Sequence, residues 1–575
     1  VFSSDALSSV AYATEEILLV LTLAGAAMVG YSIPLSLSII GLLIILTMSY
    51  RQIIFEYPEG GGAYIVGKSN LGEWPGLVAA AALMIDYVLT VAVSVAAGMA
   101  ALISAVPALL PHREALCVAA ILLVTVVNLR GVRESGQFFA VPTYIFIATI
   151  AAMLGVGAVQ ILFGHAARVE PLPSMAPTEP LTLFLLLRAF SSGCTALTGV
   201  EVISNGVSAF KKPEPKNAAF TMIGMAAILG TMFIGISAMA YYFGIVPKED
   251  ETVVSQIARA TFGTGPLYFL VQASTMVILI LAANSSFNGF PRLASILARD
   301  SYMPHQMSMM GDRLVFSNGV IILGVFSCLL IVLFNGDTHA LIPLYAVGVF
   351  LSFTISQAGM VKRWLVKKGP HWEKKLLVNG IGAVTTAIAT LIIASTKFAH
   401  GAWIVIVLIP LLITFFRAIR SHYKAVSEQV ALSRGHRPPM PRRNIVVLPI
   451  GGVNRAVIRA VDYARSRSGD IRAVLVDVDP EETARVEIQW AQWGCGVPLT
   501  VLPSPYRSVL SSLLDYLEQV LQKDQECWVT VVIPEILPAR WWQNILHNQR
   551  AFMLKGALLF KDRVILTDVP YHLTR

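Results

Sequence analysis

Long apolar runs, separated by short polar or charged breaks, fill most of the chain. Runs of about 20 residues can cross the ~30 Å hydrocarbon core of a bilayer as helices. Only 14% of the residues are charged, whereas soluble domains carry roughly 25%. The pattern therefore predicts an α-helical polytopic membrane protein with spans near residues 3–29, 33–56, 74–106, 114–129, 138–164, 182–210, 217–246, 265–298, 317–335, 339–364, 376–397 and 401–424.

The pattern changes after residue 442. Short strand-like runs such as NIVVLPI and WVTVVIP alternate with amphipathic stretches. Continuous apolar strands alternating with helices are typical of a parallel sheet covered on both faces. We therefore expect a transmembrane transporter domain over 1–430, a proline-rich basic linker over 431–442 and a cytosolic α/β domain over 443–575.

Two of the predicted spans are interrupted by small and polar residues. The first contains SSDALSSVAYATEE, and the sixth contains Ser191–Gly199, five helices later. Broken first helices in two inverted five-helix repeats point to a binding site near the middle of the membrane. The alternative explanation for the small residues is close packing between helices.

Lysine and arginine gather in alternate loops, as in 211–216 and 362–375. By the positive-inside rule both termini are expected to be cytoplasmic. The net charge of +8 is not a sign of nucleic-acid binding, because residues 443–575 hold 15 Lys and Arg against 14 Asp and Glu. The surplus lies in the membrane half.

Ionisable groups inside membrane spans are costly and usually mark a transport pathway. Asp5, Ser8 and Tyr12 share one helical face of the first span. Their oxygens suit a hard cation. The alternative for Asp5 is a helix N-cap that interacts with the helix dipole. This span has no glycine before Leu23, which favours a bare cation over an amino acid whose carboxylate needs free N–H groups.

Asp86 lies deep in the third span, followed by hydroxyl residues four and eight positions on, and Thr198 and Glu201 stand at the break in the sixth. We interpret Asp86 and Thr198 as cation ligands. Glu201 is the candidate for proton coupling, because burial raises the proton affinity of a carboxyl group. An interhelical hydrogen bond is the alternative for Asp86, and a helix cap for Glu201.

Tyr87 and Tyr345 lie in apolar spans and could close the pathway as gates, although tyrosines in such positions more often serve in packing. Glu15 and Glu16 are left as packing or surface groups. In the α/β domain, the Gly451–Gly452 turn joins a strand to a helix, but it lacks the spacing of a phosphate-binding motif. With five scattered cysteines and no catalytic or zinc-binding set, we expect no enzyme and no cofactor.

Several long motifs resemble those of the KimA-type, KUP-like potassium importers of the amino acid-polyamine-organocation superfamily. They follow the same order over essentially the whole chain. The motifs are FSSDALSSVAYATEEIL, EYPEGGGAYIV, ALTGVEVISNGVSAFKKPEPKNA, FNGFPRLASILARDSYMP, GDRLVFSNG and VILTDVPYHL.

The resemblance implies a leucine-transporter-like 5+5 inverted repeat, high-affinity potassium uptake by proton symport with alternating access, a homodimer in a bacterial plasma membrane, and inhibition by cyclic di-AMP through the cytosolic domain. Carried over by motif, the potassium ligands are Asp5, Tyr12, Asp86 and Thr198, with Glu201 coupling the proton and Tyr87 and Tyr345 gating. The rival readings are a proton-coupled amino-acid or polyamine symporter on the same fold and a membrane sensor whose soluble domain signals.

Overall fold

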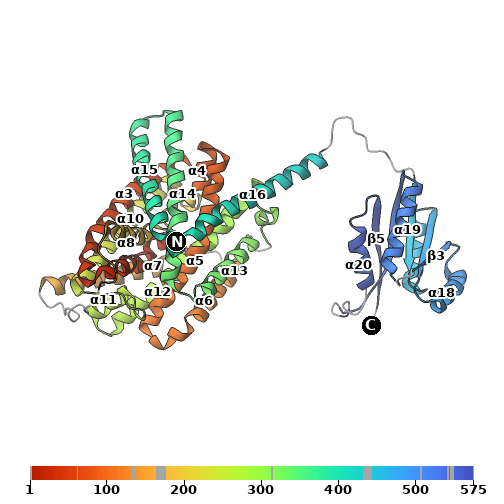
Figure 1. The fold of residues 1–575 in the computed structure, drawn as a ribbon, viewed down its shortest axis with the longest axis horizontal. Helices are drawn as coiled ribbons and strands as arrows, with labels where there is room; N and C mark the ends of the chain where they lie inside the picture. The colour runs from red at the N-terminus through yellow and green to blue at the C-terminus, as the bar shows by residue number, and fades with distance from the viewer. Residues whose placement is uncertain are drawn as a thin grey trace. The chain divides into compact units, whose positions relative to one another are not determined.

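A computed structural model describes most of the chain. The described residues are 3–60, 62–131, 136–163, 177–311, 315–431, 443–504, 508–540, 543 and 549–573. The chain divides into two compact units, Val1–Ala431 and Leu432–Arg575, which are treated separately below (Figure 1). Of the predicted linker over 431–442, only Ala431 lies within the described residues.

The first unit is a helical bundle. Its described part contains eleven helices that are long and apolar enough to span a membrane, and a shorter apolar one, Ser317–Leu333. Together they match the twelve predicted spans. The bundle comprises α1 (Ser3–Ser8) with α2 (Val10–Leu21), α3 (Ser32–Glu56), α5 (Glu73–Ala105), α6 (Arg113–Leu129), α7 (Gly136–Leu162), α8 (Leu183–Gly193) with α9 (Val202–Asn205), α10 (Glu214–Phe243), α12 (Pro266–Arg299), α13 (Ser317–Leu333), α14 (Thr338–Lys367), α15 (Trp372–Lys397) and α16 (Ala402–Val430).

Two short helices were not predicted from the hydrophobic pattern. They are α4 (Gly62–Asn70) and α11 (Val253–Phe262). Each has ten residues or fewer and includes polar or charged positions, so neither resembles a membrane span. They lie between spans and pack against the ends of the bundle, α4 on α5 and α14, and α11 on α12 and α10.

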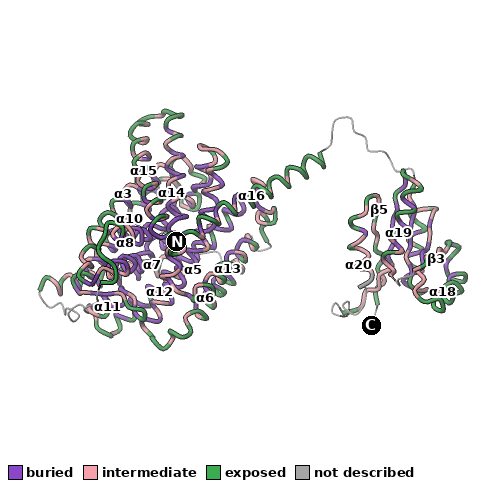
Figure 2. Tube along the Cα trace, in the orientation of Figure 1, coloured by how far each residue is buried: buried purple, intermediate pink, exposed green. Residues whose placement is uncertain are grey.

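Helix α5 is the central packing element of the bundle. It packs against α12 and α14, and the run Ala79–Ala82 is fully buried. Small side chains allow helices to approach closely, which is how membrane helices associate without a strong hydrophobic force. Figure 2 shows buried residues in the middle of the bundle and exposed ones along the last turns of α16.

The two predicted helix breaks differ in size. Between α8 and α9, Cys194–Leu197 forms a 3₁₀ turn, Thr198 is extended, and Gly199 has φ of +83°. This break is confirmed. Between α1 and α2, Ser9 keeps a right-handed helical backbone. Its Oγ lies 2.6 Å from the Ala6 carbonyl oxygen and 2.9 Å from that of Ala196. The interruption of the first span is therefore slight, and it exposes fewer carbonyl groups than predicted.

The second unit is a doubly wound α/β domain. Its five strands are all parallel and lie in the order β3-β2-β1-β4-β5. The elements are β1 (Arg443–Ile450), α17 (Arg455–Arg465), β2 (Asp470–Asp477), α18 (Pro480–Trp493), β3 (Leu499–Pro503), α19 (Val509–Lys523), β4 (Cys527–Leu537), α20 (Gln549–Leu558) and β5 (Val564–His572). The predicted parallel sheet is therefore confirmed.

Each face of this sheet has its own hydrophobic core. On one face, side chains such as Val446 and Leu475 pack against α17 and α18. On the other, side chains such as Val447 and Val531 pack against α19 and α20. This arrangement explains why the strands are apolar without interruption, since alternate residues enter opposite cores.

A charged cluster joins the beginnings of β1 and β2. Asp470 accepts hydrogen bonds from Arg472 and, at 2.5 Å, from Arg443. The hydrogen bond from Arg472, together with the two positive charges, holds the pKa of the Asp470 carboxyl below its usual range. The two arginines thus hold an ionised Asp470 carboxylate near the amino-terminal ends of β1 and β2, where the domain begins.

Candidate functional site in the helix bundle

Asp5 is buried against α12 and the α8–α9 break. Its side chain is held within the bundle, where Oδ2 accepts a hydrogen bond of 2.9 Å from the Ser285 hydroxyl on α12. Ser8, which shares its face, donates instead to the Asp5 carbonyl oxygen at 2.7 Å. Asp5 does lie in the first turn of α1. Its carboxylate nevertheless contacts a distant helix, so it is positioned to take part in a site.

Gly199 allows the break to approach α1. A Cβ built on this residue would lie 2.8 Å from the Ala6 backbone nitrogen and 2.9 Å from the Asp5 carboxyl carbon. Its φ of +83° is also one that L side chains rarely adopt. The unwound segment that carries Thr198 and Glu201 therefore reaches Asp5 because residue 199 has no side chain.

Asp86 and Thr90 form the second part of the site on α5. Both are buried, and the Thr90 hydroxyl donates a hydrogen bond of 2.9 Å to the phenol oxygen of Tyr345 on α14. Ser94, one turn further along the same face, is also buried. Asp86 Oδ1 has no hydrogen-bond partner among the described residues. The interhelical hydrogen bond that was the alternative for Asp86 is therefore not made by this oxygen.

The α8–α9 break supplies Thr198 and Glu201. Thr198 donates to the Thr195 carbonyl oxygen at 2.7 Å, and its hydroxyl interacts with the phenols of Tyr12 and Tyr345. Glu201 stands at the N-cap position of α9, but its side chain makes no capping hydrogen bond. Its Oε2 has no partner among the described residues. The site thus gathers hydroxyl and carboxyl oxygens from five spans, namely α1–α2, α5, α8–α9, α12 and α14.

The electrostatics of this site are unbalanced. Asp5, Asp86 and Glu201 are 6%, 3% and 4% exposed. They lie close enough to interact with one another, and within the described part of the chain no lysine, arginine or histidine is among the groups that act on them. A buried carboxylate without a counter-charge is very unfavourable. Protons or a bound cation must therefore supply the missing positive charge.

Tyr87 packs beside this cluster. A Cβ on Gly289 of α12 would lie 2.8 Å from the Tyr87 phenol oxygen, so the ring packs directly on that glycine. Asn205 donates to the same phenol at 3.3 Å. In turn Asn205 lies against Gly60 in the loop before α4 and Gly62, the first residue of α4. The tyrosine is therefore placed at a boundary between the site and the end of the bundle where α9 ends.

Sequence reasoning missed Ser285 and Tyr50. Ser285 belongs to Asn284-Ser285-Ser286, a polar triplet inside the apolar α12 that could have been noticed. Tyr50 on α3 is fully buried, and its phenol is acted on by Glu201 and Asp86. Nothing in the local sequence of α3 distinguishes Tyr50 from a packing residue, so only the three-dimensional structure could find it.

The interpretation of Glu15 and Glu16 as packing or surface groups needs correction. Both side chains are almost fully buried, and both face His339 on α14. They are charged groups inside the bundle, paired by tertiary contacts that no sequence spacing reveals.

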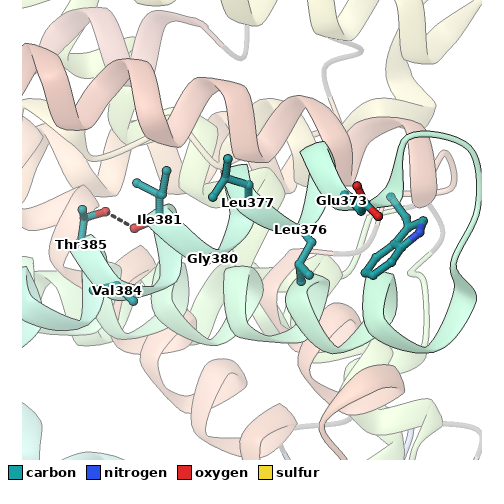
Figure 3. A pocket seen from close by; sticks show the side chains of 8 residues that line it. Glu373, Leu376, Leu377, Gly380, Ile381, Val384 and Thr385 are labelled. Atoms are coloured by element: carbon teal, nitrogen blue, oxygen red, sulfur yellow. Dashed lines mark hydrogen bonds between the residues drawn. The ribbon is translucent and has the colours of Figure 1, made fainter.

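A groove on the outside of the bundle lies apart from this site. A groove of about 600 Å³ runs along α15 and is lined by apolar residues around Gly380, with Trp372 and Glu373 at one end (Figure 3). The Thr385 hydroxyl donates to the Ile381 carbonyl oxygen of its own helix at 2.9 Å. The groove presents an apolar surface suited to acyl chains. Among the described residues, no three His, Cys, Asp or Glu side chains form a metal-binding group.

Comparisons with known proteins match both units. A family model described as amino acid permease matches residues 2–416, and one described as KimA potassium transporter C-terminal domain matches residues 442–571. These matches agree with the predicted permease-type bundle followed by a distinct α/β domain.

The chain is 45% identical over 573 residues to the potassium transporter KimA of Bacillus subtilis (strain 168), covering 99% of this chain and 94% of that one. It is 22% identical over 345 residues to the low-affinity putrescine importer PlaP of Escherichia coli K12, covering 56% of this chain and 71% of that one. A solved manganese transporter of Eremococcus coleocola is 14% identical, and the match covers 75% of this chain and 96% of that one. Its TM-score is 0.34, which is too low to support a conclusion about this chain.

The close approach at Gly199 leads to a first prediction. Gly199→Ala should lower the unfolding temperature of the purified protein and weaken its stabilisation by alkali-metal cations, because strain of about 1–2 kcal/mol adds to overlap with Ala6 and Asp5. Gly224→Ala on α10 is the matched control, since a Cβ there meets nothing within 4 Å. Equal unfolding temperatures and equal cation protection for the two variants would contradict this account.

Proposed function

Because this chain belongs to the family of the potassium transporter KimA, within the amino acid permease group, we propose that it imports potassium. The observation that carries the proposal is the set of three buried carboxyl groups on which no cationic side chain of the described residues acts. A transported cation supplies the positive charge that these carboxyl groups lack. The bundle is that of a multi-pass membrane protein, and we further propose that it lies in a bacterial plasma membrane with both termini cytoplasmic.

In this proposal the potassium ligands are Asp5, Tyr12, Asp86 and Thr198. Carboxyl, phenol and hydroxyl oxygens together replace the hydration shell of the ion. Thr198 interacts with both Tyr12 and Tyr345, so movement of the break would alter several ligands at once. Tyr345 and Tyr87 lie beside these ligands and would act as gates.

Proton coupling is assigned to Glu201. Its Oε2 has no partner among the described residues, and it interacts with Asp5. A proton on Glu201 reduces the repulsion among the carboxyl groups, whereas a bound cation favours its release, so the two ligands are linked thermodynamically. Loading both from outside and releasing both inside, by alternating access, constitutes symport.

A polyamine or amino-acid symporter is the second candidate. The similarity to a putrescine importer favours it, and buried carboxyl groups also suit an ammonium group. The first span has no glycine between Ser3 and Leu23, and its break is slight, so it offers few free N–H groups for a substrate carboxylate. Uptake of radiolabelled putrescine, alanine and rubidium into proteoliposomes separates the candidates.

The α/β domain is proposed to be regulatory, with cyclic di-AMP as inhibitor. In doubly wound sheets, ligands bind where the strand order reverses, at the carboxyl ends of the strands. Here that point lies between β1 and β4, where Gly451 and Gly452 lead into α17, and a Cβ on either glycine would meet nothing within 4 Å. This open turn can accept a phosphate next to a helix N-terminus.

A homodimer is proposed on the basis of the same domain. Among the described residues, strand β5 pairs with β4 alone and forms one edge of the sheet. Beside it, Phe552, Leu559 and Phe560 are 79% to 87% exposed. Exposed apolar groups beside an open sheet edge are typical of an interface, and a second copy of the chain would cover them.

The potassium assignment predicts the effect of Asp86→Asn. The variant should keep the fold, but its potassium uptake into proteoliposomes should fall roughly 10-fold or more, because a buried charge partner of the cation is removed. Tyr12→Phe should have a smaller effect in the same direction. The control is Asp250→Asn, since Asp250 is exposed. Normal potassium uptake by correctly inserted Asp86→Asn protein would exclude this ligand assignment.

Glu201→Gln tests the coupling. The substitution permanently mimics the protonated carboxyl, so an imposed pH gradient should no longer drive potassium uptake, while exchange of potassium for labelled rubidium persists. Both fluxes are measured in the same proteoliposomes at equal and unequal pH. If Glu201→Gln retained full drive by the pH gradient, coupling would have to reside on Asp5 or Asp86.

The regulatory proposal predicts direct nucleotide binding. The full-length protein should bind cyclic di-AMP in calorimetry at micromolar concentrations, and Gly452→Val should abolish binding by filling the turn after β1. Gly469→Val is the control. Gly469 is equally unobstructed, but it lies before β2, at the amino-terminal ends of the strands rather than at their carboxyl ends. Unchanged binding by Gly452→Val would place the nucleotide elsewhere, and no binding by the unmodified protein would remove the regulatory role.

A further inference from the structure

A second group of charged side chains lies inside the bundle, beyond the candidate site. Glu15 and Glu16 on α2 and Lys397 at the end of α15 are 4%, 5% and 3% exposed. His339, at the beginning of α14, is partly exposed and faces both glutamates. None of these four residues has a role in the transport steps described above.

Direct contacts connect the group across three elements. The His339 ring nitrogen Nδ1 lies 2.6 Å from Glu16 Oε1, and its Nε2 lies 3.7 Å from Glu15 Oε1. Glu15 Oε2 accepts a hydrogen bond of 3.3 Å from the backbone N–H of Val253, the first residue of α11. The first contact joins α2 to α14, and the last ties α2 to the start of α11.

The group contains two acidic and two basic side chains. Lys397 Nζ has no hydrogen-bond partner among the described residues, and Glu16 is the carboxylate that acts on it. Removing one partner of a buried acid–base pair is strongly unfavourable. Loss of Glu16 or of His339 would therefore leave the other without its nearest partner.

This cluster lies on the two helices that carry the tyrosines of the site. Glu16 follows Tyr12 by four residues, about 6 Å along α2, and His339 precedes Tyr345 by six residues, about 9 Å along α14. On its other side is a small cavity of about 40 Å³, lined by Glu15, His339 and Ser104. Such a cavity is large enough for ordered water. The cluster thus separates that cavity from the site.

We propose that Glu16 and His339 form a latch that closes the extracellular end of the pathway. Glu15 and Lys397 position the pair, Glu15 by holding the start of α11 and Lys397 by compensating charge. The extracellular assignment rests on the proposed function and its orientation. Opening requires α2 and α14 to separate, which breaks the contact at 2.6 Å and lets water reach both groups.

Other charged groups around the latch define its surroundings. Asp337 accepts from the backbone N–H of His339 at 2.9 Å, and Arg188 acts on Lys397. The remaining charged residues that line the small cavity are Arg113, Lys248, Glu249, Asp250 and Glu251. Glu251 is engaged by Arg259 at 3.0 Å. Among the described residues, these neighbours leave Glu16 as the partner with the shortest contact to the His339 ring.

Accessibility of a thiol behind the latch tests the proposal. Ser94→Cys places a reporter on α5, between the site and Ser104, in a background where the five native cysteines are replaced by alanine or serine. A membrane-impermeant thiol reagent is applied outside right-side-out vesicles. Glu16→Gln and His339→Gln should each raise the modification rate about tenfold, a size typical of coupling between two conformations.

The double variant distinguishes a latch from a general loss of packing. If the two residues act through one contact, Glu16→Gln with His339→Gln should be modified no faster than either single variant. Glu249→Gln, an exposed carboxylate lining the same cavity, should leave the rate unchanged. Unaltered rates in both single variants, or additive increases in the double variant, would overturn the latch.

A second measurement covers the case in which the glutamine variants fold poorly. Glu16→Cys combined with His339→Cys should allow a short bifunctional thiol reagent to hold α2 and α14 together, stopping uptake until a reductant is added. Undiminished uptake after complete cross-linking would overturn the latch. The accessibility assay makes no use of potassium flux, so the latch and the proposed function can fail separately.

Discussion

A buried carboxyl group in a low-dielectric interior needs a positive partner, and this requirement organises the whole helical bundle. It is met in two different ways. Glu15 and Glu16 are compensated by His339 and Lys397, which belong to the protein. Asp5, Asp86 and Glu201 interact mainly with one another. The first arrangement supplies its own basic partners, whereas the second leaves a deficit that a mobile ion or proton can fill.

Much of the fold could be predicted from hydrophobic patterning because lipid imposes such a strong constraint on sequence. Spans of about 20 apolar residues have few alternatives, and the uninterrupted apolar strands of the second domain indicated burial on both faces. Short α4 and α11 escaped because they satisfy neither constraint. The slight break at Ser9 was overestimated, since a serine hydroxyl that suggests an unwound backbone can instead bond to carbonyl groups, here those of Ala6 in its own span and Ala196 in the α8–α9 break.

The candidate site was partly predictable for a related reason. A charged residue in an apolar run is conspicuous, so Asp5, Asp86 and Glu201 could be selected and the structure places them together. Tyr50 and Ser285 could not be selected with equal ease, because hydroxyl groups are common in membrane helices. The pairing of Glu16 with His339 joins residues 323 positions apart, and local spacing holds no information about such a contact.

The absence of a side chain at Gly199 has a mechanical consequence. The first span and the α8–α9 break meet there, with the Ala6 nitrogen and the Asp5 carboxyl carbon within 3 Å of where a Cβ would be. A flexible side chain between them would absorb small displacements. Direct contact leaves no such slack, so a displacement of the α8–α9 segment is passed on directly to α1.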